Sequence, residues 1–91
     1  MKLNPKHAFA YYNLGYIHIE LQVYSKGVEY FTGAINSDER YYQAYYGRAY
    51  CYEILGDVQN AKKDYETVLN INMEYNPAKE GVGRVSRIME E

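Results

Sequence analysis

The sequence repeats itself at an interval of 34 residues. The segment Ala10–Tyr16 reads AYYNLGY, and the segment Ala44–Tyr50, 34 positions later, reads AYYGRAY. Leu21 matches Leu55 at the same interval. A fixed interval of this length is typical of repeat proteins, in which each unit packs mainly against its neighbours. The 91 residues hold two such units with short flanking segments, which predicts one small repeat domain.

Apolar residues in each unit recur at helical spacing. Between residues 6 and 21, the side chains of Ala10, Leu14, Ile17 and Leu21 fall on one face of a helix. Similar patterns predict helices over residues 24–36, 41–55 and 58–71 and from residue 76 onward. The first two helices are joined by only two residues, so they must be antiparallel neighbours. We therefore expect an all-α fold of five antiparallel helices.

Turn residues and small residues refine this prediction. Gly56 is expected to take the left-handed conformation that ends a helix, and Asp38 is expected to cap the helix over residues 41–55. Small residues recur in register where paired helices would touch: Gly15 and Gly27 in the first unit, Ala49 and Ala61 in the second. These positions predict a close approach of the paired helices.

Composition argues against several classes of protein. The net charge of −2 provides no basic stripe for nucleic acid, and no apolar run approaches the roughly 20 residues of a membrane helix. Lys2 is not followed by the apolar stretch of a signal peptide. We expect a soluble protein without a targeting segment, cytoplasmic or, if part of a longer exported protein, periplasmic. Cys51 is the single cysteine, which excludes an internal disulfide.

The repeated positions resemble the tetratricopeptide repeat (TPR) family, whose unit is a 34-residue helix–turn–helix. The matching residues are Tyr11, Leu14, Gly15, Gly27, Phe31 and Ala34, then Tyr45, Ala49, Tyr52, Gly56, Asp57, Ala61 and Tyr65. The resemblance implies a right-handed α-α superhelix. Residues 1–7 would end a preceding repeat or form an arm, 8–41 and 42–75 would be two repeats, and 76–91 a capping helix or the start of a third. Arg48 and His18 depart from the pattern, where leucine and tyrosine are usual.

No motif in the sequence predicts catalysis, a cofactor or a metal site. Cys51 and His18 occupy adjacent repeat positions, but no third group is placed to orient them. Glu20 and Glu53 fall near the same level of successive repeats, and a carboxylate pair can serve acid–base chemistry. We interpret the first pair as packing residues and the second as residues on a groove rim. The chain is therefore expected not to be an enzyme.

The tyrosines suggest a binding surface instead. In the TPR family the first helix of each repeat lines the concave face, which would place Tyr12, Tyr16, Tyr46 and Tyr50 side by side. The predicted groove also includes Phe9, Asn13 and Gln43, with Glu20, Glu53 and Arg84 at its rim. We hypothesise a protein-interaction module that binds a peptide or partner segment of apolar or proline-rich character.

Two alternatives accompany this hypothesis. The rings could instead pack on one another between repeats, in a structural element of a longer array. The exposed first helix could also support a weak homodimer. One partner class is predicted to be absent. TPR co-chaperones hold the C-terminal carboxylate of heat-shock proteins with lysine, asparagine and arginine. The matching positions are Tyr12, Tyr16, Gly47, Pro77 and Gly81, which argues against that partner.

Overall fold

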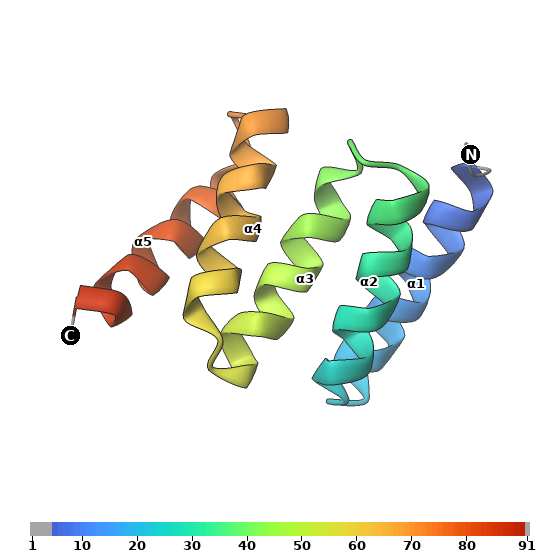
Figure 1. The fold of residues 1–91 in the computed structure, drawn as a ribbon, viewed down its shortest axis with the longest axis horizontal. Helices are drawn as coiled ribbons and strands as arrows, with labels where there is room; N and C mark the ends of the chain where they lie inside the picture. The colour runs from blue at the N-terminus through green and yellow to red at the C-terminus, as the bar shows by residue number, and fades with distance from the viewer. Residues whose placement is uncertain (1–4, 91) are drawn as a thin grey trace.

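The computed structural model describes residues 5–90, which form five α-helices in succession (Figure 1). The helices are α1 (Pro5–Glu20), α2 (Tyr24–Ser37), α3 (Tyr42–Leu55), α4 (Val58–Ile71) and α5 (Asn76–Glu90). Each helix runs antiparallel to the one before it. The predicted all-α class and the five predicted helices are confirmed, with boundaries that agree to within about two residues.

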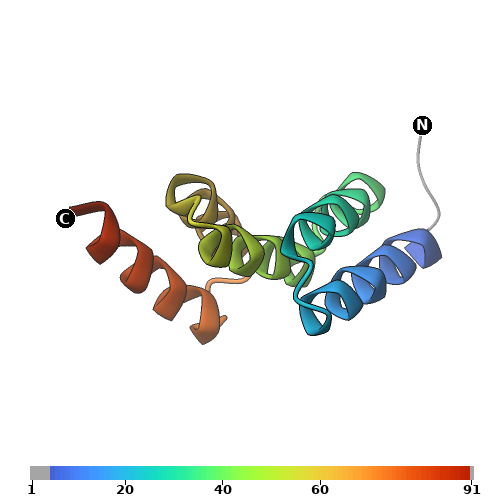
Figure 2. The same cartoon turned by 90° about the horizontal axis from the view of Figure 1, so that it is seen from below.

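The helices alternate between two layers. Figure 2 shows α1, α3 and α5 in one layer and α2 and α4 in the other. The middle helix of the first layer is set back relative to α1 and α5, so this layer forms the inner side of an arch. The first and last helices, α1 and α5, lie at opposite ends of the long axis, and the Cα trace extends over 41 × 29 × 20 Å. This arrangement is that of a short solenoid.

The turn between α3 and α4 is built as the sequence predicts. Gly56 adopts φ 87°, a left-handed conformation that glycine accepts without strain. The Gly56 and Asp57 amides then donate to the last carbonyls of α3, at Glu53 and Tyr52, over 3.1 and 2.9 Å. Asp57 in turn caps α4, since its Oδ1 accepts a hydrogen bond from the Asn60 amide. One glycine and one aspartate thus end one helix and start the next.

The prediction that Asp38 caps α3 is wrong. The residue at the N-cap position is Tyr41, and α3 has no side-chain cap. The Asp38 carboxylate instead accepts from the amide of Arg40 at 3.0 Å, and its carbonyl accepts from the Tyr41 amide at 3.1 Å. These bonds form a tight turn before the helix, which leaves the carboxylate outside the first turn of α3.

The core is organised around two aromatic rings that are one repeat apart. Phe31 of α2 is fully buried between α1 and α3, where a β-carbon added to Gly15 or Gly47 would lie 2.7 or 2.4 Å from the ring. Tyr65 of α4 holds the equivalent place, and a β-carbon on Gly81 of α5 would lie 2.6 Å from its ring. Because glycine has no side chain, these positions leave the space that each ring fills, and we call each such space a socket.

The other small residues also pack as expected. A β-carbon on Gly27 would lie 2.9 Å from the sulfur of Cys51 and 3.6 Å from the Gly15 carbonyl oxygen. Ala49 and Ala61 are fully buried in the second repeat. The predicted close approach is confirmed for Gly15 and Gly27, and Ala49 and Ala61 are buried together in the core of the second repeat.

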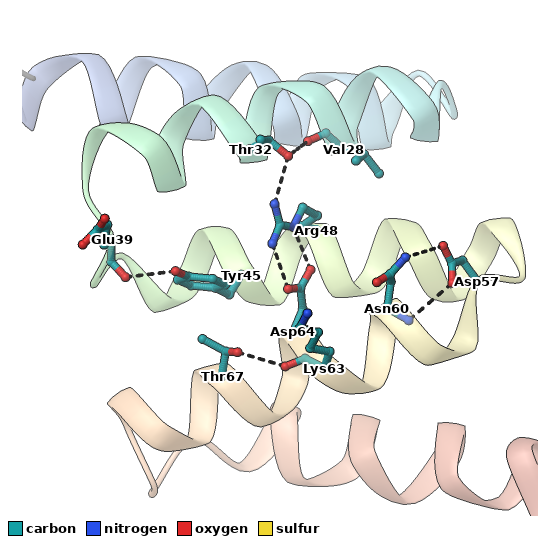
Figure 3. Close-up of polar contacts among 10 residues, drawn as sticks. All are labelled: Val28, Thr32, Glu39, Tyr45, Arg48, Asp57, Asn60, Lys63, Asp64 and Thr67. Atoms are coloured by element: carbon teal, nitrogen blue, oxygen red, sulfur yellow. Dashed lines mark hydrogen bonds and ion pairs between the residues drawn. The ribbon is translucent and has the colours of Figure 1, made fainter.

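A polar cluster joins three helices on the side of the arch opposite the inner layer (Figure 3). Arg48 of α3 donates two hydrogen bonds to the carboxylate of Asp64 in α4, at 2.7 and 2.9 Å. A third bond, 3.0 Å long, runs from Arg48 to the hydroxyl of Thr32 in α2. The arginine that departs from the family pattern thus connects both neighbours of its helix.

No helix within residues 5–90 is long and apolar enough to span a membrane.

Candidate partner-binding groove

A shallow pocket lies between α1 and α3. Its lining residues are Tyr16 and Ile19 of α1 and Tyr46 and Tyr50 of α3, and its volume is about 200 Å³. Three of the four tyrosines predicted for the groove are therefore brought together, each from a helix of the inner layer. Tyr16 is the most exposed of them, at 36% of its surface, whereas Tyr46 and Tyr50 are half-buried. The pocket thus offers aromatic faces rather than charged groups.

The fourth predicted tyrosine, Tyr12, has a different environment. Its ring stacks on that of Tyr41, with the ring centroids 5.1 Å apart. It also makes an edge-to-face contact with Tyr16, with the centroids 5.0 Å apart. It also contacts the buried ring of Phe31 at 6.0 Å. Tyr12 therefore supports the position of Tyr16 and packs against the segment that enters the second repeat.

The tyrosines of α3 also pack against other helices. The ring centroid of Tyr46 lies 5.7 Å from that of Tyr65 in α4 and 5.5 Å from that of Tyr75, which precedes α5. Tyr50 meets the ring of Tyr24 at 6.4 Å. Aromatic pairs at these separations contribute beyond their buried area and restrict ring rotation. The rings of α3 thus pack between helices, as one interpretation made from the sequence expects. A binding role for their exposed parts stays a prediction.

Two phenol groups of the pocket, those of Tyr16 and Tyr46, are neutral at physiological pH. Burial and the neighbouring phenol of Tyr12 raise the pKa of Tyr16 well above its ordinary value. Burial also raises the pKa of Tyr46. A protonated phenol can donate one hydrogen bond and accept others. The pocket can therefore bind an apolar group against the rings and a carbonyl group at their rims.

An ion pair fixes one edge of the inner layer. Glu53 of α3 accepts two hydrogen bonds from Arg84 of α5, at 2.9 and 3.1 Å, and one from the hydroxyl of Tyr65 at 2.7 Å. The bond from Arg84 lowers the pKa of the Glu53 carboxyl below its ordinary value. The sequence predicted both residues at the rim but not their pairing. The pair leaves each charge largely neutralised by the other.

The remaining predicted groove residues lie outside the pocket lining. Phe9, Asn13 and Glu20 are exposed on α1, and Gln43 is half-buried on α3. Ile19, which does line the pocket, was missed by sequence analysis. Ile19 lies 34 residues before Glu53 and occupies the equivalent position of the first repeat. Its side chain is apolar, whereas that of Glu53 is charged.

The residues considered for catalysis have packing environments. Cys51 is fully buried, which raises the pKa of its thiol to about 11. The ring of His18 is hydrogen-bonded through Nδ1 to the Leu14 carbonyl at 2.8 Å and lies 4.9 Å from the ring of Tyr30. Among the described residues, no group of three or more histidine, cysteine, aspartate or glutamate side chains could hold a metal ion.

Comparison with known proteins identifies the family. A family model described as the tetratricopeptide repeat matches residues 10–41 and 42–75, in agreement with the internal repeat and the helix pairs. This chain belongs to the tetratricopeptide repeat family. TPR domains mediate protein–protein interactions, and this TPR domain has the all-α solenoid fold of the family.

Several relatives contain a similar segment. Serine/threonine-protein phosphatase 5 of Rattus norvegicus is 31% identical over 91 residues, which are 100% of this chain and 18% of the phosphatase. Protein bimA of Emericella nidulans is 27% identical over 71 residues, which are 78% of this chain and 9% of that protein. The TPR chain thus spans less than a fifth of these relatives, and the phosphatase similarity concerns only that part of the enzyme.

Solved structures have the same fold. The crystal structure of MamA superposes with a TM-score of 0.91 at 23% identity, covering 96% of this chain and 51% of that one. The second TPR domain of human RPAP3, in complex with an HSP70 peptide, gives 0.85 at 26% identity, covering 88% and 67%. The first TPR of Spaghetti (RPAP3), bound to an HSP90 peptide, gives 0.90 at 17% identity, covering 97% and 72%. These comparisons do not support our exclusion of heat-shock peptides as partners.

Proposed function

We propose that this TPR domain binds an extended partner segment on its inner layer, with an apolar or proline side chain anchored in the pocket of Tyr16, Ile19, Tyr46 and Tyr50. The observation that carries this proposal is the pocket itself, which brings aromatic faces from two successive repeats to one place. Tyrosine provides a broad apolar surface and a hydroxyl at a small cost in side-chain entropy, and it is enriched at interaction hot spots.

The surroundings of the pocket favour an apolar anchor over an anionic one. Arg84, a cation whose charge acts on the phenol of Tyr46, is already bonded to Glu53. The family resemblance assigns five positions to the clamp of lysine, asparagine and arginine in heat-shock co-chaperones, and here they hold Tyr12, Tyr16, Gly47, Pro77 and Gly81. An anchor that stacks on the rings and accepts a hydrogen bond from a phenol fits this chemistry better than a carboxylate does.

The peptide complexes of the two RPAP3 domains make an acidic C-terminal peptide the competing candidate. Both candidates would use the inner layer, but they differ in the charge of the ligand and in the dependence of affinity on salt. A carboxylate ligand loses affinity as ionic strength rises, whereas an apolar anchor is little affected. The two candidates can therefore be separated in one binding assay.

The first experiment is affinity capture of partners from the source cell, followed by fluorescence anisotropy with peptides from the captured proteins. An acidic heat-shock C-terminal peptide serves as the competing ligand. Changing Tyr16→Ala together with Tyr50→Ala is expected to reduce binding by roughly tenfold or more, with little loss of helicity by circular dichroism. Tyr11→Ala is the matched control, because Tyr11 is 40% exposed on the same helix, close to the 36% of Tyr16, and lies outside this pocket.

An unfolded double variant, or one that binds as the wild type does, would show that the rings serve packing alone. Tight, salt-sensitive binding of the acidic peptide would favour the competing candidate instead.

A further inference from the structure

Tyr16, Tyr50 and Arg84 occupy the same position in three successive repeats, 34 residues apart. They belong to α1, α3 and α5, the three helices of the inner layer (Figure 2). Tyr16 and Tyr50 both line the pocket described above. The repeat therefore places Arg84 in line with the pocket, on the next helix of the same layer.

The guanidinium of Arg84 is held in one orientation. Its Nε and Nη2 donate to the carboxylate of Glu53 at 2.9 and 3.1 Å, and Nη2 lies 3.4 Å from the hydroxyl oxygen of Tyr65. Tyr65 donates its hydroxyl hydrogen to Glu53 at 2.7 Å, and its side chain is fully buried. Because a planar guanidinium bonded at two of its nitrogens cannot rotate freely, the direction of its third nitrogen is also fixed.

That third nitrogen is available to a ligand. Within residues 5–90, Nη1 of Arg84 donates to no acceptor, and the side chain is exposed over 42% of its surface. The two N–H groups of Nη1 can therefore bind a ligand without breaking the bonds to Glu53. A ligand carboxylate at this place would face the negative charge of Glu53, so a neutral carbonyl oxygen fits better.

The pocket presents donors as well as rings. Within the described residues, the hydroxyls of Tyr46 and Tyr50 have no protein acceptor, whereas the buried Tyr65 donates to Glu53. Every buried polar side-chain atom of residues 5–90 has a partner, so these two hydroxyls lie where water or a ligand reaches them. None of the four residues that line the pocket is charged. The inner layer thus matches a neutral ligand that has apolar surface and hydrogen-bond acceptors.

A proline-rich segment has this chemistry. Proline has no backbone N–H, so it brings an apolar ring and a carbonyl acceptor without a donor that needs a partner. In the polyproline II conformation the carbonyls make no internal hydrogen bonds and stay free to accept. An extended segment without proline would bring an N–H group at each residue, and an N–H group buried without an acceptor is unfavourable.

The period of such a segment agrees with the spacing of the helices. One turn of polyproline II contains three residues and is about 9 Å long. Helices that pack side by side lie about 8–10 Å apart. In the inner layer α1 contacts α3, and α3 contacts α5. Prolines three residues apart can therefore lie on Tyr16 and Tyr50, with a carbonyl of the next turn at Arg84.

We propose that the segment bound by the inner layer is a proline-rich stretch in the polyproline II conformation, whose prolines stack on Tyr16 and Tyr50 and whose main chain accepts a hydrogen bond from Arg84. This inference rests on the proposed function, because it concerns the same pocket and names the class of its ligand. It adds Arg84 as a residue that binds the partner, with Glu53 as its positioning residue.

The test uses the full chain and the fluorescence anisotropy of a labelled peptide, three repeats of Pro-Pro-Ala with a C-terminal amide. The control peptide Pro-Pro-Pro-Ala-Ala-Ala-Pro-Pro-Pro has the same composition, but no two of its prolines are three residues apart. It is expected to bind roughly threefold more weakly or worse, because its prolines cannot occupy both rings in register.

Variants of α5 test the role of the arginine. Arg84→Ala is expected to weaken binding of the Pro-Pro-Ala peptide roughly tenfold. Arg84→Lys is expected to weaken it roughly threefold or more, because lysine keeps the charge but not the planar set of donors. Arg87→Ala is the matched control, an exposed arginine of the same helix outside the row, and should leave binding unchanged.

A change in the peptide tests the acceptor. Replacing an alanine by lactic acid turns the preceding carbonyl into that of an ester, which is a weaker acceptor. One of the three ester peptides should bind wild type roughly threefold more weakly or worse, and this loss should be absent in Arg84→Ala. Glu53→Gln should also weaken binding, and the double variant with Arg84→Ala should lose no more than Arg84→Ala alone, because Glu53 acts through the arginine.

Several outcomes would overturn the inference. These are an absence of binding of the Pro-Pro-Ala peptide up to millimolar concentration, equal binding by wild type and Arg84→Lys, and an ester effect that Arg84→Ala retains. Circular dichroism checks the fold of each variant, and if Arg84→Ala is unfolded, Arg84→Lys still decides.

Failure of the inference is distinct from failure of the proposed function. A captured apolar peptide that binds through Tyr16 and Tyr50 while the Pro-Pro-Ala peptide does not bind would contradict only the inference. If Tyr16→Ala together with Tyr50→Ala leaves the binding of both peptides unchanged, the proposed function fails as well.

Discussion

The ring of Phe31 lies against Gly47 so closely that a β-carbon at this glycine would be 2.4 Å from the ring. The ring is fully buried, and Gly15 bounds its other side, where a β-carbon would be 2.7 Å away. Phe31 therefore cannot move toward either helix to make room. The contact between these two residues joins the first repeat to the second, since Phe31 belongs to α2 and Gly47 to α3.

Gly47→Ala is expected to lower the free energy of unfolding by roughly 1–3 kcal/mol, because the added methyl overpacks the socket. Gly83→Ala is the matched control in α5, where the added methyl meets open space. It should raise stability by about 0.5–1 kcal/mol, the usual difference between alanine and glycine within a helix. Urea denaturation followed by circular dichroism measures both. A stabilising Gly47→Ala would show that the ring yields and that helix propensity decides the outcome.

The second prediction concerns the ion pair of Arg48 with Asp64. Asp64 is 4% exposed, so Asp64→Ala leaves the guanidinium partly buried without its carboxylate. We expect a loss of roughly 3 kcal/mol in the free energy of unfolding. Adding Arg48→Leu, which places the family's usual residue at this position, should recover at least half of that loss. Thr32 then keeps its own bond to the Val28 carbonyl at 2.7 Å.

A double-mutant cycle completes this test, with Arg48→Leu measured alone as its fourth corner. Strictly additive losses would mean that the two charges contribute independently, and that the bonds between Arg48 and Asp64 add no coupling energy.

The helices and their ends could be predicted because their signals are local. The apolar residues that give the helical periodicity belong to the helices that they predict. The pair Gly56–Asp57 likewise belongs to the turn that it predicts. Asp38 shows the limit of such signals. A residue with good capping chemistry was followed by a turn in which backbone bonds fixed its position, and these bonds could not be foreseen from residue type alone.

The site could be predicted only in outline. The resemblance to the TPR family implied that Tyr16, Tyr46 and Tyr50 share the inner layer, and in the structure they line one pocket. Contacts between repeats depend on the angle between helices, which periodicity does not give. The bond from Arg84 to Glu53 joins residues 31 apart on α5 and α3, so a pair could not be distinguished from two separate rim charges by sequence alone.

The third prediction is a pH dependence that originates at Glu53. The hydrogen bond from Arg84 lowers the pKa of this carboxyl in the folded state. A carboxyl with a lowered pKa adds stability above its unfolded pKa of about 4.3, and this contribution disappears as the pH falls through the folded value. Wild type should therefore be more stable than Glu53→Gln at pH 7, and the difference should vanish at strongly acidic pH.

Urea midpoints at a series of pH values measure this difference. Glu66→Gln is the control, because Glu66 is exposed on α4 and its substitution should change stability little at any pH. A difference between wild type and Glu53→Gln that stays constant with pH would assign the effect to packing rather than to the charge.

The last prediction uses Cys51 as a probe of the contact between the repeats. Its thiol is fully buried, and a β-carbon on Gly27 of α2 would lie 2.9 Å from its sulfur. Burial raises the thiol pKa to about 11, so at pH 8 the reactive thiolate is about a thousandth of the total. Alkylation by iodoacetamide at pH 8 should be at least a hundredfold slower in the native chain than in the urea-unfolded chain. A variant with Cys51→Ala and Met73→Cys provides the exposed reference, since Met73 is 71% exposed, and it should react at similar rates in both states. Rapid alkylation of native Cys51 would mean that α2 and α3 separate readily, and that the two repeats do not unfold as one cooperative unit.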